Sequence, residues 1–115
     1  MPDRIKPETV KIGPIGHQAS LTIWKHVKQG DECEPFAGDN SIQVDGDFSA
    51  AVLTIEGSLN GRNFYPLFDN HGGLASWKAP GIKVLNGDIA MVCPRIEGGD
   101  ETTDLTVTIY SGPAL

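Results

Sequence analysis

The histidines and cysteines are the side chains most able to carry catalysis or hold a metal, and their spacing favours neither. The three histidines, His17, His26 and His71, are scattered and form no His-x-His or His-Glu-x-x-His pattern of a zinc site. Cys33 and Cys93 do not form the Cys-x-x-Cys pair of a zinc ribbon or a thioredoxin-like site. The chain also lacks a Gly-x-Ser-x-Gly elbow and a Walker-type glycine loop. No nucleophile, base and orienting group can be assembled, so we expect a protein that is not an enzyme and uses no cofactor.

The carboxylates are the next candidates, either as calcium ligands or as an acid and base pair. Asp45 and Asp47 are close in sequence, and Glu97, Asp100 and Glu101 cluster in one turn signal. Calcium takes about six to eight oxygen ligands, and the EF-hand loop pattern is absent. Paired carboxylates for glycoside hydrolysis are compatible with the spacing, but nothing distinguishes one carboxylate from the others. A solvated acidic surface is the favoured interpretation, and we expect no metal site.

The two cysteines can stay as free thiols or form a disulfide. The N-terminal residues contain no apolar segment typical of a signal peptide. No apolar run approaches the roughly 20 residues that span a bilayer. A chain without a secretory signal is expected in a reducing cytoplasm, where disulfides are rare. We therefore expect two free thiols and no membrane partner.

Aromatic residues could form a platform on which a sugar ring stacks. The same side chains are ordinary residues of a core or of a protein interface. Because aromatic residues total only 7% of the chain and do not cluster in sequence, we favour a core or an interface. If the protein binds sugars instead, Trp24 and Trp77 are the expected stacking residues.

Length and charge restrict the class of protein further. A chain of 115 residues, with 39% hydrophobic and 21% charged residues, fits one globular domain. The net charge of −6 argues against general nucleic-acid binding, which needs positive charge to replace phosphate counterions. The charge is uneven, because residues 1–30 carry +3 and residues 31–115 carry −9. A basic N-terminal segment can dock onto an acidic neighbour or the next copy of the chain, or remain a solvated tail.

Residues 1–18 are expected to form an extended arm. Prolines and glycines interrupt this stretch at short intervals and disfavour both a helix and a long strand. The arm nevertheless carries spaced apolar residues, which suits a segment that lies along a surface. These apolar residues are Ile5, Val10, Ile12 and Ile15.

Alternating apolar and polar residues dominate the rest of the chain, and no stretch shows the apolar stripe of an amphipathic helix. In the strongest example, Leu105, Val107 and Ile109 point one way and the intervening residues point the other. We expect an all-β fold, a β-sandwich or jelly roll of about seven to nine short antiparallel strands, in a single domain over residues 19–115. The expected strands are 20–27, 41–48, 51–57, 64–68, 74–78, 82–84, 89–96 and 102–110.

Three local features refine this prediction. Asp45-Gly46 could be a hairpin turn, but the alternation continues beyond it, so we expect a strand with Gly46 at a bulge or a close approach. Asn60-Gly61 is a strong turn signal because both residue types tolerate positive φ. Pro94 lies in an apolar strand and cannot donate to a sheet, which predicts an edge position or a bulge.

Two stretches of the chain resemble small head proteins of tailed bacteriophages. Residues 42–68 resemble a strand of the form V-x-V-x-G-x-F, then a strand ending I-E-G-S, an Asn-Gly turn and an aromatic residue three positions on. Residues 94–107 are similar to the ending P-R-x-x-G-G-D-x-T-T-x-L-T-V of the same proteins. The resemblance covers residues 41–110, and Phe64 stands where Trp is expected.

The resemblance implies a capsid decoration (cement) protein. Such proteins are rich in β-structure, bind the outer surface of a mature shell and clamp neighbouring capsomers, usually as dimers or trimers. The resemblance thus implies a structural protein of the virion, made in the host cytoplasm, whose partners are the major capsid protein and further copies of itself. No catalytic residues come with the family. On this view we expect the capsid or oligomer contact to use Ile5, Lys6, Val10, Lys11, Ile12, Ile15, Trp24 and Phe36.

A second resemblance keeps an alternative open. The sequence I-E-G-S-x-N-G followed by an aromatic residue is also similar to a strand–turn–strand piece of discoidin-like carbohydrate-binding sandwiches. That similarity implies a carbohydrate-binding or adhesion module on a virion, with Trp24 and Trp77 as the residues that stack on sugar.

Overall fold

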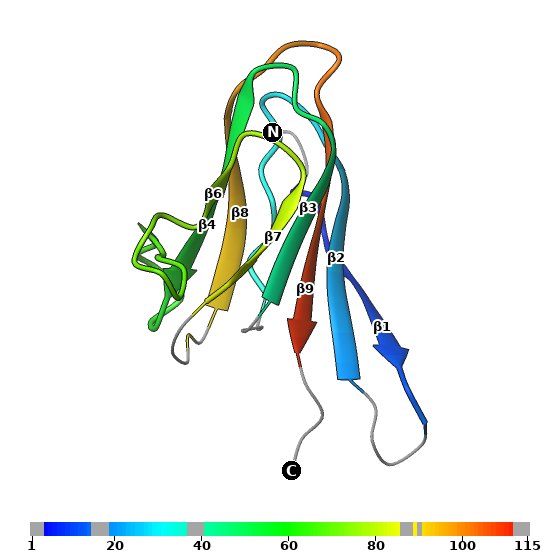
Figure 1. Cartoon of the computed structure of the whole chain (residues 1–115), viewed down its shortest axis with the longest axis vertical. Coiled ribbons are helices and arrows are strands. Elements are labelled where there is room, and N and C mark those ends of the chain that lie inside the picture. The colour runs from blue at the N-terminus through cyan, green and yellow to red at the C-terminus, as the bar shows by residue number, and fades with distance from the viewer. Residues whose placement is uncertain (1–3, 15–18, 37–40, 86–88, 90, 112–115) are drawn as a thin grey trace.

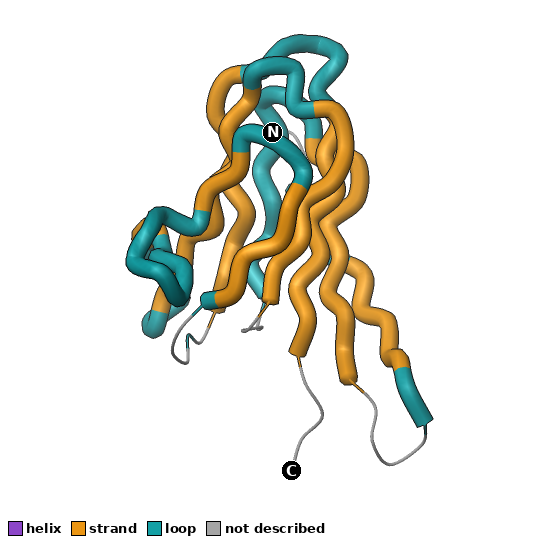
Figure 2. Tube along the Cα trace, viewed as in Figure 1, coloured by secondary structure: helices purple, strands orange, loops and turns teal. Residues whose placement is uncertain are grey.

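A computed structural model describes residues 4–14, 19–36, 41–85, 89 and 91–111 of the chain. These residues form strands, turns and loops but no helix, so the expected all-β class is confirmed (Figure 2). The strands are β1 (Glu8–Ile12), β2 (Ala19–Val27), β3 (Ser41–Asp47), β4 (Ala51–Ser58), β5 (Tyr65–Pro66), β6 (Ser76–Trp77), β7 (Gly81–Val84), β8 (Met91–Gly98) and β9 (Asp104–Ser111).

The described strands pair antiparallel in two sheets (Figure 1). The larger sheet has the order β1-β2-β9-β3-β7. In the smaller sheet, β8 pairs with β4 along its whole length, while the short strands β5 and β6 pair with different parts of β4. Because Glu56 pairs with both Pro66 and Cys93, β5 and β8 lie on opposite edges of β4.

One hydrophobic core lies between the two sheets. Leu105, Val107 and Ile109 alternate inward along β9 and are fully buried, as the period of two in the sequence predicts. The smaller sheet contributes Leu53 and Ile55 from β4. Each such side chain contributes about 1.5–3 kcal/mol to folding by leaving water. The same core includes Trp24, Val27, Ile42, Val44, Phe48, Ala75, Trp77, Leu85 and Val92.

Strand β1 differs from the sequence prediction, which gave no regular strand before residue 19. Its five residues pair with β2, from Glu8 opposite Ile23 to Ile12 opposite Ala19. The stretch between Pro7 and Gly13 contains no proline or glycine, so every residue in it can join a ladder. None of the five is buried. Strand β1 is therefore held by backbone pairing and contributes no side chain to the core.

Strand β2 also departs from simple alternation. The register with β9 shifts between Trp24 and Val27, and His26 between them has a φ of 55°. This bulge turns Val27 inward, where it is almost completely buried. The alternation of apolar and polar residues does not reveal such a bulge, because the extra residue is not apolar and leaves no sign in the pattern.

The predictions for Gly46 and Pro94 are confirmed. Strand β3 continues through Gly46, which pairs with Leu105 at a φ of 117°, and a Cβ at this position would collide with the backbone carbonyl of Asp104. The hairpin-turn interpretation of this dipeptide is wrong. Pro94 lies in β8, which has β4 on one side and, among the residues that the structure describes, only the isolated bridge of Phe36 with Val92 on the other. Pro94 is thus part of an edge strand.

Two of the expected strands are shorter than the sequence predicts, because the chain turns back between them. The carboxylate of Asp69 accepts hydrogen bonds from the backbone N–H groups of His71 and Gly73, at 2.9 and 3.0 Å. This turn brings Leu74 opposite Phe68 in an isolated bridge. The two-residue strands β5 and β6 pair with β4 on either side of this turn, and Leu67 and Ala75 next to them each form a backbone hydrogen bond with Ile55 of β4. The predicted turn at Asn60-Gly61 is confirmed, with a φ of 75° at the glycine.

Candidate functional site

The two tryptophans lie inside the protein, which corrects the expectation that they face a partner or a sugar. Trp24 is 0% exposed, and its indole N–H donates to the backbone oxygen of Glu34 at 2.9 Å. Trp77 is 4% exposed, and its indole N–H donates to the backbone oxygen of Gly81 at 3.1 Å. A buried indole with its N–H satisfied is a core residue. Neither ring can contact a capsid or stack on a sugar in this fold.

The segment before β1 anchors the N-terminal part of the chain to the body. The backbone N–H of Ile5 donates to Glu32, and that of Glu34 donates back to Ile5, both at 2.8 Å. The Ile5 side chain is half-buried and packs against the core. This expected contact residue therefore has a role inside the fold, whereas Lys6 beside it is exposed.

A further expected contact residue, Phe36, lies beside β8 of the smaller sheet. Phe36 is 39% exposed and exchanges two backbone hydrogen bonds with Val92 at the free side of β8, at 2.8 and 2.9 Å. It is therefore available to a partner, on the smaller sheet. The expected contact at Ile15 lies outside the described residues.

Val10 and Ile12 of β1 are exposed apolar residues on the outer face of the larger sheet. Val10 pairs with Leu21, and Leu21 lies on the face opposite to buried Thr22 and Trp24. Val10 therefore points away from the core, and Ile12 points the same way two residues on. Their exposures are 43% and 42%. Lys11 between them is exposed and points to the opposite face.

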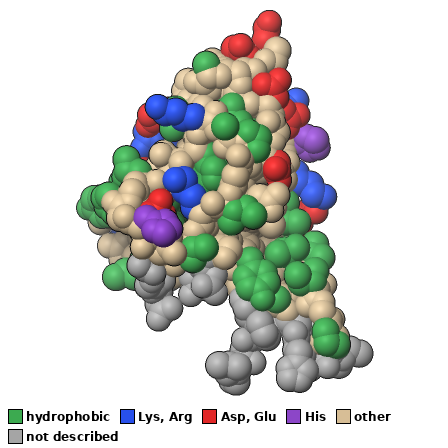
Figure 3. Space-filling view, viewed as in Figure 1, with side chains coloured by type: hydrophobic (Ala, Val, Ile, Leu, Met, Phe, Trp, Pro, Cys, Tyr) green, Lys and Arg blue, Asp and Glu red, His purple; other side chains and the backbone are tan. Residues whose placement is uncertain are grey.

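The register extends this apolar area across the sheet, because directly paired residues of neighbouring strands share a face. One row across all five strands consists of Val10, Leu21, Tyr110, Ser41 and Val84. Figure 3 shows hydrophobic side chains gathered over the lower parts of β1, β2 and β9 in the view of Figure 1. We name this area the outer sheet surface; it comprises Val10, Ile12, Leu21, Ile23 and Tyr110.

Sequence reasoning identified two residues of the outer sheet surface and missed the other three. Leu21 and Ile23 were recognisable as one aliphatic face of their strand, opposite a face that contains Trp24. A strand with apolar groups on both faces can turn only one of them toward a given core. The apolar residues on both faces of this strand therefore indicated that one apolar face would remain uncovered.

Charged side chains lie near the outer sheet surface and at the far end of the molecule. Near the outer sheet surface, Lys6 and Lys11 are exposed, and the Lys25 Nζ lies 3.0 Å from a carboxylate oxygen of Glu8. Figure 3 shows Asp and Glu side chains at the end of the molecule with the β3–β4 and β8–β9 connections. There the hydroxyl and backbone N–H of Thr102 hold the pKa of Asp100 below its usual range. The apolar surface thus has exposed lysines and one carboxylate, Glu8, near it, and a group of acidic side chains lies at the other end of the molecule.

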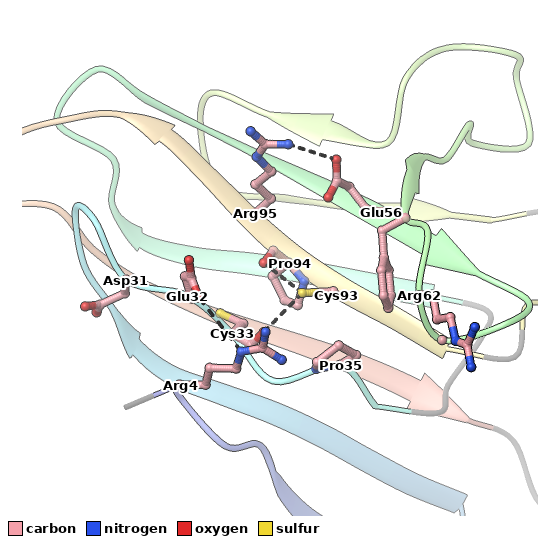
Figure 4. A pocket seen from close by; sticks show the side chains of 12 residues that line it. Arg4, Asp31, Glu32, Cys33, Pro35, Glu56, Arg62, Cys93, Pro94 and Arg95 are labelled. Atoms are coloured by element: carbon pink, nitrogen blue, oxygen red, sulfur yellow. Dashed lines mark hydrogen bonds and ion pairs between the residues drawn. The ribbon is translucent and has the colours of Figure 1, made fainter. Parts of the chain in front are cut away.

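A hollow of about 430 Å³ brings the two cysteines together (Figure 4). Both are free thiols, as the sequence predicts, and the Cys93 thiol donates to the backbone oxygen of Cys33 at 3.2 Å. Ion pairs line the same hollow. The Arg4 Nε lies 3.8 Å from Glu32, and an Arg95 Nη lies 3.4 Å from Glu56.

The thiols in this hollow are not prepared for nucleophilic chemistry. Burial raises the pKa of Cys33 to about 12, with the neighbouring Cys93 and Asp31 acting in the same direction. Burial also raises the pKa of Cys93 to about 11, with Glu56 acting in the same direction. Both thiols are protonated at neutral pH, and a protonated thiol is a weak nucleophile. The residues that line the hollow therefore contribute packing and ion pairs to the fold, and the hollow contains no reactive thiol.

Comparisons with protein families, with curated protein sequences and with solved structures gave no match. Within the described residues, no three or more His, Cys, Asp or Glu side chains are grouped to hold a metal ion. The described part of the chain also contains no helix long and apolar enough to cross a membrane. The candidate functional site with the most support is an interaction surface, the outer sheet surface.

Proposed function

We propose that this protein is a structural virion protein that binds the outer surface of a phage capsid and stabilises contacts between coat-protein capsomers. The structural observation that carries the proposal is the outer sheet surface, an apolar area beside β1 at the end of the larger sheet. The motif resemblance over residues 41–110 supports the capsid as the partner. Neither catalysis nor a cofactor is part of this function.

The physical properties of the outer sheet surface suit a partner of this kind. An apolar sheet face next to an edge strand is typical of a surface that another protein covers. Covering the exposed parts of Val10 and Ile12 would contribute about 1 kcal/mol each. The exposed Lys6 next to β1 would favour approach to acidic groups on the shell. Modest affinity for each copy is sufficient, since attachment to a repeating lattice multiplies it.

The proposal also covers the finer architecture. We place the protein among jelly-roll sandwiches, with residues 19–115 as the body and the N-terminal segment as part of the docking element. Two antiparallel sheets around one core support the sandwich. The carbohydrate-binding alternative loses its two stacking residues, since Trp24 and Trp77 are buried. A glycan screen tests this alternative if the protein binds neither shell.

The test is co-sedimentation of the purified full chain with mature and immature capsids of its source phage, over a range of salt concentrations. The variant Val10→Asp places a charge on the outer sheet surface. Thr9→Asp is the matched control, because Thr9 is also exposed in the same strand but points to the other face. We expect saturable binding to mature shells, a loss of about tenfold or more in affinity for Val10→Asp, and little change for Thr9→Asp.

Two results would contradict the proposal. Absence of binding to either shell would remove the capsid function and direct attention to a glycan screen. Equal losses for Val10→Asp and Thr9→Asp would show that shell binding does not use the outer sheet surface.

A further inference from the structure

A hollow of about 420 Å³ lies beside the turn that follows β4. The end of β4, the turn over residues 58–63, β5 and Ile89 all contribute residues to its described lining. These loops lie at the opposite side of the molecule from β1 (Figure 1). A hollow of this volume is within the range of about 300–1,000 Å³ that is typical of small-molecule sites. We name it the turn hollow.

The floor of the turn hollow is apolar and fixed by the fold. Gly57 of β4 has no side chain, and the side chains of Leu67 and Ile89 lie over its backbone, where an added Cβ would be 2.8 Å from each. Leu67 and Ile89 also pack against the hydrophobic core. The core therefore holds this floor in place, and a ligand that enters the hollow meets an apolar surface.

An exposed aromatic ring stands beside this floor. Tyr65 of β5 pairs directly with Gly57 of β4 and lines the turn hollow, and its side chain is 66% exposed. An aromatic side chain offers a flat apolar face on which a small ring can stack. Trp24 and Trp77 cannot serve in this way because they are buried. Tyr65 is thus an exposed stacking surface next to a hollow.

The polar groups of the turn hollow are side-chain amides on a well-defined turn. The Asn60 Oδ1 accepts the Ser58 hydroxyl at 3.0 Å and the backbone N–H groups of Arg62 and Asn63 at 2.9 and 3.0 Å. These bonds fix the amide and use only its oxygen, so the Nδ2 group keeps two N–H donors for a ligand. The exposed Asn63 adds a second amide, which can both donate and accept.

The charge of the turn hollow restricts the ligand further. None of the described residues that line it is charged. A phosphate or carboxylate would find no cation among these residues, and the net charge of −6 on the chain opposes the approach of an anion. A purely apolar ligand would cover the amides without bonding to them. The lining suits a small neutral ring with an apolar face and several hydroxyl groups.

We propose that the turn hollow binds a neutral saccharide unit, whose ring stacks on Tyr65 and whose hydroxyl groups bond to the side-chain amides of Asn60 and Asn63. The site shares no residue with the outer sheet surface and does not depend on the proposed capsid function. A single unit binds weakly, because it makes few contacts. If the capsid function holds, many copies on one shell add these weak contacts together.

The test is titration of the isotope-labelled full chain with glucose, galactose, mannose and N-acetylglucosamine, followed through the asparagine side-chain amide signals by NMR. We expect at least one sugar to bind saturably, with a Kd on the order of 1–10 mM, the range for a ligand of about twelve heavy atoms. Tyr65→Ala should raise this Kd at least about tenfold, whereas Tyr65→Phe keeps the ring and should change it less than about twofold. Asn63→Ala should raise it about threefold or more.

Phe68→Ala is the matched control and should leave the Kd unchanged. Phe68 is 58% exposed in the same loops, but it lines the neighbouring hollow of about 390 Å³. Far-UV circular dichroism and thermal unfolding show whether each variant is folded. Absence of saturable binding by all four sugars would overturn the inference, and so would equal losses for Tyr65→Ala and Phe68→Ala.

The capsid proposal fails separately from this one. Tyr65→Ala should bind shells as well as the unaltered chain does. A protein that binds shells but none of the four sugars loses only the saccharide site, and a protein that binds a sugar but no shell loses only the capsid function.

Discussion

The two faces of the larger sheet come from the same strands but use apolar residues differently. On the inner face, Ile42, Val107 and Ile109 are fully buried and hold the sheets together. On the outer face, Val10 and Ile12 remain more than 40% exposed. Folding depends on the first set and gains little from the second. The difference indicates that stability depends on the inner side of these strands and that residues on the outer side can be altered separately.

Removing a core side chain should have the greatest effect on stability. Ile109→Ala should lower the free energy of unfolding by about 2–5 kcal/mol, because the lost contacts leave a cavity between the sheets. Ile82→Ala on the outer face should change it by less than about 0.5 kcal/mol. Urea unfolding measures both variants. Similar losses at the two positions would show that the outer face also supports the fold.

Gly46 tests how closely β3 and β9 approach. Gly46→Ala should cost about 1–3 kcal/mol, because the residue has positive φ and its Cβ would collide with the Asp104 backbone. Gly30→Ala is the matched control. Gly30 also has positive φ, at 81°, but nothing lies within 4 Å of the added Cβ. Equal unfolding free energies for the two variants would mean that β3 and β9 can move apart at Gly46 without loss of stability.

The buried thiols should make stability fall in alkali. An unfolded thiol ionises near pH 9, whereas the pKa of Cys33 is about 12 and that of Cys93 about 11 in the folded chain. Because the folded pKa values are raised, their contribution is complete below pH 9 and is lost as the pH rises toward 11 and 12. We expect each thiol to contribute a decline on the order of 2 kcal/mol by pH 11.

The Cys33→Ala variant separates the thiols from other groups that titrate in alkali. Urea unfolding at several pH values between 8 and 11 should give a shallower decline for Cys33→Ala than for the unaltered chain. Identical slopes would mean that Cys33 ionises equally easily in both states.

The smallest effect on stability is expected at β1. Val10→Ala should change the free energy of unfolding by less than about 0.5 kcal/mol, because the side chain contacts no core residue. The same variant should weaken capsid binding measurably. A loss of stability comparable to that of Ile109→Ala would show that β1 is part of the folding core.

Much of the fold was predictable because its signals are local. Alternation in β9 identified Leu105, Val107 and Ile109 as inward residues, and Asn60-Gly61 marked its turn through the conformations that these residue types tolerate. Strand β1 was not predictable from its own residues. It forms because β2, the next strand along the chain, offers a free edge, and the residues of β1 do not show that this edge is free.

The candidate surfaces were harder to predict than the strands. Residue type suggested that Trp24 could face a partner, yet the loop with Glu34 closes over it. The exposure of Tyr65 and Phe68 likewise follows from the chain turning back at Asp69 and leaving them at an edge of the smaller sheet. Burial depends on how the two sheets assemble. The type of an apolar residue does not show whether its face of the strand will be covered.

The length of β1 has a consequence for the solubility of the protein. A free sheet edge can recruit further chains and seed fibrous aggregates. Here the edge offers five residues, and Pro7 and Pro14 lie just beyond its two ends. Proline cannot donate to a ladder, so a strand added to this edge stops growing at both ends. The chain can thus present a sheet edge to one specific partner at high concentration and stay dissolved.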